Sequence, residues 1–359
     1  MLLATGPGVQ PLWRSKRPVG DFPHPQIYRL FRQDVHLEND PTCWVVSDGR
    51  PGMENQCMGL AEAVGLAFTV KQIHPRAPWK FLPSVMWPAP LASLGPTSDP
   101  ISPPWPRLLI GTGRLSVAIS MAVRRHSGGR TFTVQIQNPA VSPRHFDLVV
   151  PPRHDRLRGP NVVSSRGALH RVTDDRLAEA AKEFAPMVAH LPRPLVAVLV
   201  GGDNGVYKLT AQGTRELAAN LVAMAKFTGA GLAVTPSRRT GSANEKILRE
   251  ALSEAPAVVW DGTGANPYFG FLGLADAVVA TCDSVSMASE AAATGKPVYI
   301  VDLEGGSRKF DEFHQGLRDD GITRPFTGTL ETWTYAPLDD TAQVAALVHQ
   351  RLNAHAGAR

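Results

Sequence analysis

Residues 275–301 read ADAVVATCDSVSMASEAAATGKPVYIV, which is the pattern of a strand, a turn, a helix and a second strand. The apolar runs at residues 277–281 and 298–301 have the length and composition of buried parallel strands. Between them, Asp283 and Ser284 predict a helix N-cap. This unit puts the start of a helix at the carboxyl edge of a parallel sheet, and the rest of the chain is organised around it.

The start of this helix suits a phosphate group. Its first amides have no partner within the helix, and the positive end of the helix dipole lies beside them. Glu290 follows in the same helix, where its carboxylate would reach the hydroxyls of a ribose attached to that phosphate. An ordinary capped helix without a ligand is the alternative interpretation, and the strand–turn–helix pattern alone does not exclude it.

The alternation of strands and helices extends along the chain from residue 42 and restarts near residue 195 after a Pro-rich, charged linker. Such alternation predicts parallel sheets with right-handed crossovers. We therefore expect an α/β protein with two Rossmann-like doubly wound domains facing across a cleft. The predicted divisions are a disordered extension (1–41), a first domain (42–190, with a linker from about 151), a second domain (191–335) and a C-terminal helix (336–359).

Two further loops of the second half follow predicted strands and have groups that suit an anion. The first is rich in glycine, which lets the backbone approach phosphate oxygens, although it lacks the Lys-Ser/Thr of a P-loop. The second offers guanidinium and hydroxyl groups. Because both loops belong to the same sheet edge as the helix start at Ser284, we expect one anion site. Its predicted members are Gly201, Gly202, Asp203, Asn204, Lys208, Ser237, Arg238, Arg239, Thr240, Ser284, Val285, Ser286 and Glu290.

The first half has one polar loop of comparable interest, DGRPG at residues 48–52, with Glu54, Asn55 and Gln56 at the start of the next helix. No GxGxxG fingerprint accompanies it, so a dinucleotide site is not indicated. Asp48 and Glu54 are the candidate general bases for a reaction in the predicted cleft. No histidine or cysteine spacing predicts a metal site.

Composition excludes several classes of protein. The chain has 359 residues, is 43% hydrophobic and 19% charged, and carries a formal charge of +5, without a basic patch interleaved with aromatics. Nucleic acid is therefore not an expected partner. The absence of a long apolar run excludes a membrane span, and three scattered cysteines indicate a reducing compartment. We expect a cytoplasmic protein; a peripheral position at the inner face of a membrane stays open, as does a mitochondrial surface if the source is eukaryotic.

Several motifs recur in this order in one known family. They are WVVSDGRPGMENQCMGLAEAVG, VQIQNP, VLVGGDN, TPSRRTG, the segment DAVVATCDSVSMASEAAATGKPVYI and KFDEFHQGL. The chain resembles the mitochondrial fission "elongated mitochondria" (ELM1-like) family over roughly residues 42–326, and its form is that of a bacterial-type member. The family is similar in pattern to glycosyltransferases of the GT-B architecture.

The resemblance implies that Glu290 takes the ribose and that Ser284, Val285 and Ser286 offer amides to the diphosphate of a UDP-type nucleotide sugar, with no tightly bound cofactor. On this hypothesis the chain transfers the sugar, by inversion and without a metal, to an envelope or lipid-linked acceptor. The alternative is a non-catalytic scaffold that recruits a protein partner at a membrane surface, as the resemblance to a plant fission factor implies. A dinucleotide oxidoreductase or epimerase is disfavoured because GxGxxG and a YxxxK pair are absent.

Overall fold

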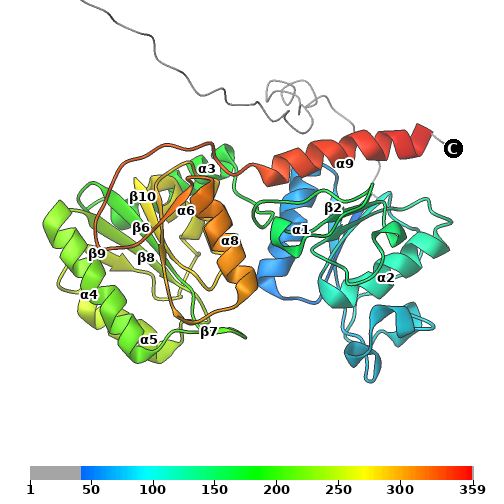
Figure 1. Cartoon of the computed structure of the whole chain (residues 1–359), viewed down its shortest axis with the longest axis horizontal. Coiled ribbons are helices and arrows are strands. Elements are labelled where there is room, and N and C mark those ends of the chain that lie inside the picture. The colour runs from blue at the N-terminus through cyan, green and yellow to red at the C-terminus, as the bar shows by residue number, and fades with distance from the viewer. Residues whose placement is uncertain (1–41, 358–359) are drawn as a thin grey trace, which may run out of the picture. The chain divides into compact units, whose positions relative to one another are not determined.

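The computed structural model describes residues 42–357. The extension predicted at residues 1–41 lies outside the described residues. The described part contains two parallel α/β sheets, whose helices and strands are labelled in Figure 1.

The first sheet has five parallel strands in the order β2-β1-β3-β4-β5. Its strands are β1 (Cys43–Ser47), β2 (Phe68–Gln72), β3 (Leu108–Thr112), β4 (Phe132–Ile136) and β5 (Leu148–Val150). The crossover helices are α1 (Pro51–Val64) and α2 (Gly113–His126). Short 3₁₀ helices interrupt the long connection before β3 and the segments around β5: η2 (Trp79–Phe81), η3 (Ser84–Met86), η4 (Leu91–Ser93), η5 (Pro143–His145) and η6 (Arg153–Asp155).

The second sheet has six parallel strands in the order β13-β11-β10-β6-β8-β9. They are β6 (Leu195–Val200), β8 (Gly231–Pro236), β9 (Ala257–Val259), β10 (Ala277–Thr281), β11 (Val298–Val301) and β13 (Thr323–Pro325). The helices around it are α3 (Asp174–Val188), α4 (Ala211–Thr228), α5 (Ser242–Leu252), α6 (Tyr268–Leu274), α7 (Val285–Ala292) and α8 (Arg308–Asp319). The last helix, α9 (Asp340–Gly357), belongs to the first sheet. A small antiparallel pair joins β7 (Tyr207–Lys208) and β12 (Glu304–Gly305).

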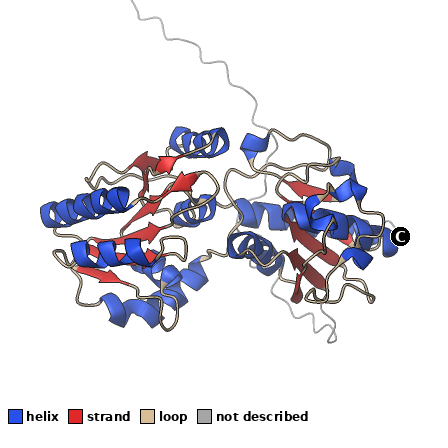
Figure 2. Ribbon diagram, turned by 90° about the horizontal axis from the view of Figure 1, so that it is seen from below, coloured by secondary structure: helices blue, strands red, loops and turns tan. Residues whose placement is uncertain are grey.

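The central strands are continuous apolar runs because both of their faces are covered by helices. In β6, Leu195, Ala197 and Leu199 belong to the core on one face of the sheet, with α6, α7 and α8. Val196, Val198 and Val200 belong to the core on the other face, with α4 and α5. Figure 2 shows helices on both faces of each sheet. The doubly wound α/β class predicted from the sequence is thus confirmed.

Two helices pack against elements distant in the chain. The last helix, α9, lies against α1 and supplies Val344, Val348 and Leu352 to the core of the first sheet. The helix α3 packs closely on α6. A Cβ atom on Gly273 of α6 would lie only 2.5 Å from the carbonyl oxygen of Leu177 in α3, so a larger residue would not fit at this position. The domain boundary predicted at residue 190 stays a prediction. Helix α3 lies before residue 190 in the sequence, and yet it packs on α6, a helix of the second sheet.

Some predicted boundaries were wrong at helix starts. The first crossover helix was expected near Glu54, but α1 begins at Pro51, because proline is accommodated in a first turn whose amides need no partner. β3 runs to Thr112, and α2 starts at the next residue, Gly113. No helix within the described residues is long and apolar enough to cross a membrane.

Candidate functional site

The helix α7 begins as the sequence predicts. The backbone of Ser284 is extended, and its hydroxyl accepts a hydrogen bond of 3.3 Å from the amide of Met287. Nothing in residues 42–357 accepts a hydrogen bond from the amides of Ser284, Val285 and Ser286. These three donors lie at the carboxyl end of β10, where the helix dipole adds a partial positive charge.

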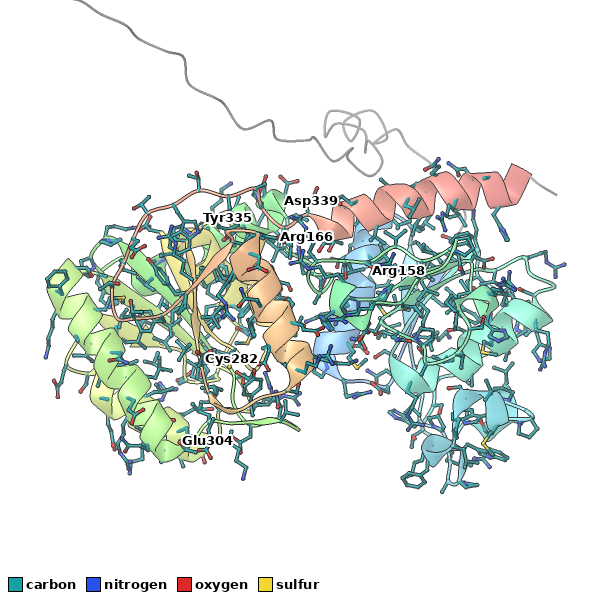
Figure 3. All side chains as sticks on the ribbon, viewed as in Figure 1. Arg158, Arg166, Cys282, Glu304, Tyr335 and Asp339 are labelled. Carbon is teal, nitrogen blue, oxygen red and sulfur yellow. The ribbon has the colours of Figure 1, made fainter. Side chains whose placement is uncertain are left out.

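Asp283 does not share the capping role predicted for it. Cys282, labelled in Figure 3, follows the last residue of β10, and Asp283 comes next with a buried side chain. Its carboxylate accepts hydrogen bonds from the hydroxyl of Thr281 (2.6 Å) and the amide of Gly202 (3.1 Å), and pairs with Arg239 at 2.6 Å. Asp283 therefore joins the ends of three strands, β6, β8 and β10.

The glycine-rich loop after β6 approaches this carboxylate closely. A Cβ atom on Gly201 would lie 2.2 Å from the carboxylate oxygens of Asp283, and one on Gly202 would lie 2.0 Å from the carbonyl oxygen of Arg239. The side-chain amide of Asn204 donates to the Asp283 carbonyl oxygen at 3.0 Å. Asp203 accepts a bond from the amide of Leu209. Most polar groups of this loop thus hold the loop itself in shape.

The loop after β8 contributes fewer free groups than the sequence predicts. The hydroxyls of Ser237 and Thr240 both donate to the carbonyl oxygen of Gly201, and Arg239 is paired with Asp283. These three side chains, expected to face an anion, instead tie the loop to β6 and β10.

Arg238 is different from its neighbour. It is exposed, and within residues 42–357 nothing pairs with its guanidinium. The ammonium of Lys208, exposed in β7, also has no partner in the described chain. The structure therefore brings three predicted loops together at one sheet edge and leaves two cations and the α7 amides unpaired there.

Glu290 lies further along α7 and is only 7% exposed. Its Oε2 accepts a hydrogen bond of 2.6 Å from the hydroxyl of Tyr268. Burial raises the pKa of the carboxyl to about 7, against the opposing effects of the Tyr268 hydrogen bond and the charge of Arg171. The other carboxyl oxygen, Oε1, has no hydrogen-bond partner in the described chain. It is also not fully buried. One carboxyl oxygen thus remains free for a hydroxyl group.

The first-sheet residues predicted near this edge differ in their contacts. The carboxylate of Asp48 is held by the guanidinium of Arg50 at 2.6 and 3.0 Å, and this pairing raises the pKa of Arg50. Glu54 accepts one long bond of 3.4 Å from Gln72. A Cβ atom on Gly52 would lie 3.6 Å from Oγ of Ser286, so the starts of α1 and α7 are neighbours.

A family model described as mitochondrial fission ELM1 matches residues 51–352. The chain belongs to the mitochondrial fission ELM1 family. This ELM1-family chain is 34% identical over 276 residues to "Mitochondrial fission protein ELM1" of Arabidopsis thaliana, an alignment that covers 69% of the chain and 64% of the plant protein. It is 25% identical over 352 residues to an uncharacterized protein, RP120, of Rickettsia prowazekii (strain Madrid E), covering 85% of the chain and 97% of that protein.

Among solved structures, UDP-GlcNAc 2-epimerase from Methanocaldococcus jannaschii is similar, with a TM-score of 0.54 at 10% sequence identity. The match covers 87% of this chain and 99% of the epimerase. It shows that the ELM1-family chain has the two-sheet α/β architecture of GT-B proteins. At this identity the likeness concerns the fold alone.

Two side chains of this ELM1-family chain were missed as neighbours of the site. Tyr268 packs against the core of the second sheet, and its hydroxyl also donates a hydrogen bond to Glu290. His314 of α8 is buried, with Nε2 2.7 Å from the carbonyl oxygen of Cys282. The spacing of Phe310, Phe313 and Leu317 on one helical face would have predicted α8 and with it the position of His314.

The anion-site loops line neither of two cavities that the structure contains. One, of about 540 Å³, lies beside α2 and the connection before β3, and the other, of about 700 Å³, lies between η6 and α8. Within residues 42–357, no group of three histidine, cysteine or acidic side chains is arranged to hold a metal ion.

Proposed function

We propose that this ELM1-family chain binds a UDP-type nucleotide sugar at the carboxyl edge of the second sheet and transfers the sugar, with inversion, to an envelope or lipid-linked acceptor. The observation that carries the proposal is the meeting of three loops on Asp283, with the α7 amides, Arg238 and Lys208 left unpaired beside them. A diphosphate needs such a set of amide donors and cations.

We assign each part of the nucleotide sugar to residues at this edge of the sheet. The diphosphate lies against the amides of Ser284, Val285 and Ser286, and its charge is offset by Arg238 and Lys208. The ribose meets the free Oε1 of Glu290, whose other oxygen is held by Tyr268. At neutral pH a carboxyl with a pKa of about 7 both donates and accepts hydrogen bonds, which suits a pair of vicinal hydroxyls.

In the transfer step the acceptor hydroxyl oxygen forms a bond to the anomeric carbon as the bond from that carbon to the diphosphate breaks. The electron pair leaves with the diphosphate, where amides and cations stabilise the charge without a metal. A general base takes the acceptor proton. We assign this role to Glu54 rather than Asp48, because the Asp48 carboxylate is already paired with Arg50, whereas Glu54 has one long contact.

Calorimetric titration with UDP tests the donor site. Wild-type protein should bind UDP saturably, and Arg238→Ala should weaken binding by about tenfold, the value of one hydrogen-bonded charge. The matched control is Lys226→Ala, which removes an exposed cation from the C-terminal end of α4. This end of α4 lies toward the amino ends of the strands, away from the proposed site. Absence of saturable binding, or equal affinity of the Arg238 variant and wild type, would refute the donor site.

The transfer step has its own test. Glu54→Gln should keep the UDP affinity of the wild type and lower turnover of a transferred sugar by about a hundredfold or more, as expected for loss of a general base. Turnover at the wild-type rate would remove Glu54 from this role.

One observation favours the alternative, a scaffold that keeps the fold without catalysis. Several polar side chains of the loops, including Ser237, Arg239 and Thr240, are satisfied within the protein. A scaffold would show no sugar turnover with any donor and would retain a stoichiometric protein partner in a pull-down, whereas a transferase would turn over sugar without that partner.

A further inference from the structure

The connection between β2 and β3 contains both buried and exposed large apolar side chains. Trp87 is buried, in the core formed with α2. Phe81, Val85 and Met86 are instead 73%, 62% and 56% exposed. They are three of the six large hydrophobic side chains that are exposed in residues 42–357, and they fall within six positions of the chain. We call these three residues the apolar tip.

Hydrogen bonds to neighbouring residues hold the backbone that carries the apolar tip. The guanidinium of Arg114 at the start of α2 donates to the carbonyl oxygens of Lys80 and Leu82, and the hydroxyl of Ser84 donates to the carbonyl oxygen of Arg114 at 3.1 Å. The indole of Trp87 donates to the carbonyl oxygen of Leu82. Figure 1 draws this segment beside α2. The exposure of the tip is therefore built into the fold.

The stretch of sequence that contains the apolar tip is rich in basic residues. Residues 63–146 contain nine lysines and arginines but one acidic residue, Asp99, a net charge of +8. The whole chain carries +5, so the remainder of the sequence is net negative. The positive charge of this protein is thus concentrated in the part of the chain that presents the exposed apolar side chains.

Cations and apolar side chains also share one cavity there. Val85 lines the cavity of about 540 Å³ together with Arg124, Arg125 and His145. Lys80 lies over the ring of Phe81, with its ammonium 5.0 Å from the ring centre. Apolar atoms flanked by ammonium and guanidinium groups match the chemistry of a bilayer interface, where acyl chains meet phosphate groups.

We propose that the apolar tip docks this protein on the surface of an anionic lipid bilayer. Phe81, Val85 and Met86 enter the boundary between headgroups and acyl chains, and Lys80 and Arg125 contact lipid phosphates. Apolar burial and attraction to anionic lipid each contribute to such binding. The inference goes beyond the proposed function and holds equally for a transferase and for a scaffold.

Vesicle co-sedimentation of the full chain tests the proposal. Wild-type protein should bind vesicles of phosphatidylcholine mixed with phosphatidylglycerol more tightly than vesicles of phosphatidylcholine alone, and added salt should weaken the binding. The double variant Phe81→Asp/Met86→Asp should lower the affinity by about tenfold or more, because two apolar groups are replaced by charges that the bilayer rejects. The matched control is Phe227→Asp in α4, whose side chain is 86% exposed and lies outside the basic segment; it should bind like wild type.

A second variant keeps the test decisive if the double variant is unstable. Lys80→Glu/Arg125→Glu changes only exposed charges, and it should lose the preference for anionic vesicles. Equal vesicle binding by the wild type, the Phe81→Asp/Met86→Asp variant and the Lys80→Glu/Arg125→Glu variant would overturn the proposal. Any membrane contact would then belong to another surface. Absence of vesicle binding by the wild type would also overturn it, and would leave a protein partner as the occupant of the tip.

Discussion

Single residues explain why the loops of the second sheet have so many small side chains. The carboxylate of Asp283 is buried, and burying a charge is costly unless it is paired and hydrogen-bonded. The amide of Gly202, the hydroxyl of Thr281 and the guanidinium of Arg239 supply those partners. The sequence shows an Asp-Ser pair before a helix, from which a shared cap is the natural prediction; the inward turn of Asp283 depends on two loops more than forty positions away.

Gly202 should be far less tolerant of substitution than Gly205. Gly202 has φ +153°, and a Cβ there would meet the carbonyl oxygen of Arg239. Gly202→Ala should therefore reduce the free energy of unfolding by about 3 kcal/mol, from backbone strain and overlap together. Gly205→Ala in the same loop, with no atom within 4 Å of the added Cβ, should change it by less than about 0.5 kcal/mol. Chemical denaturation of both variants checks this, and similar values would contradict the close packing at Asp283.

Glu290 should make stability depend on pH. Its pKa is about 7 in the folded protein against 4.5 unperturbed, so the folded state binds the proton more tightly. The resulting stabilisation is complete below about pH 4.5 and is lost as pH rises through about 7. Between about pH 4 and pH 8, wild type should lose roughly 3 kcal/mol relative to Glu290→Gln, which cannot titrate. Denaturation of the two proteins at both pH values measures this; a difference independent of pH would show that the carboxyl is not buried as described.

At the scale of elements, the sequence predicted best where burial on both faces produces an unbroken apolar run. β10 and β11 were predicted to the residue for this reason. The strands β7 and β12 have two residues each, which is too few to show a pattern. β13 is exposed at two of its three positions and therefore has no apolar run. The helix α8 was missed because its charged residues hide the apolar face of Phe310, Phe313 and Leu317. The three anion loops were predicted, but not which of their side chains would be used within the protein.

The helix α9 should be essential to the first sheet although it ends the described chain. Val348 is fully buried in the core beside α1, so Val348→Asp would put a charge into that core and should cost several kcal/mol, about 3 or more. Gln350→Asp, at an exposed position of the same helix, should be nearly neutral. Thermal unfolding compares the two, and a small effect of Val348→Asp would mean that α9 is not part of this core.

At the scale of the whole molecule, composition and alternation predicted two doubly wound α/β sheets, and the fold likeness to a GT-B epimerase agrees. The overall charge of +5 is less informative than its distribution, since residues 63–146 alone carry +8. The two proposed partners are both anionic and would bind at different places: a diphosphate at the carboxyl edge of the second sheet, and an anionic lipid surface at the apolar tip.

We propose that a nucleoside diphosphate binds to the three loops joined by Asp283. Hydrogen exchange of the backbone amides with and without UDP tests it most directly, because the proposed donors to the diphosphate are amides. We expect slower exchange in residues 201–206, 237–241 and 284–290 when UDP is present, and no change in the apolar tip. Unchanged exchange in all three loops at saturating UDP, or protection confined to the first sheet, would contradict it.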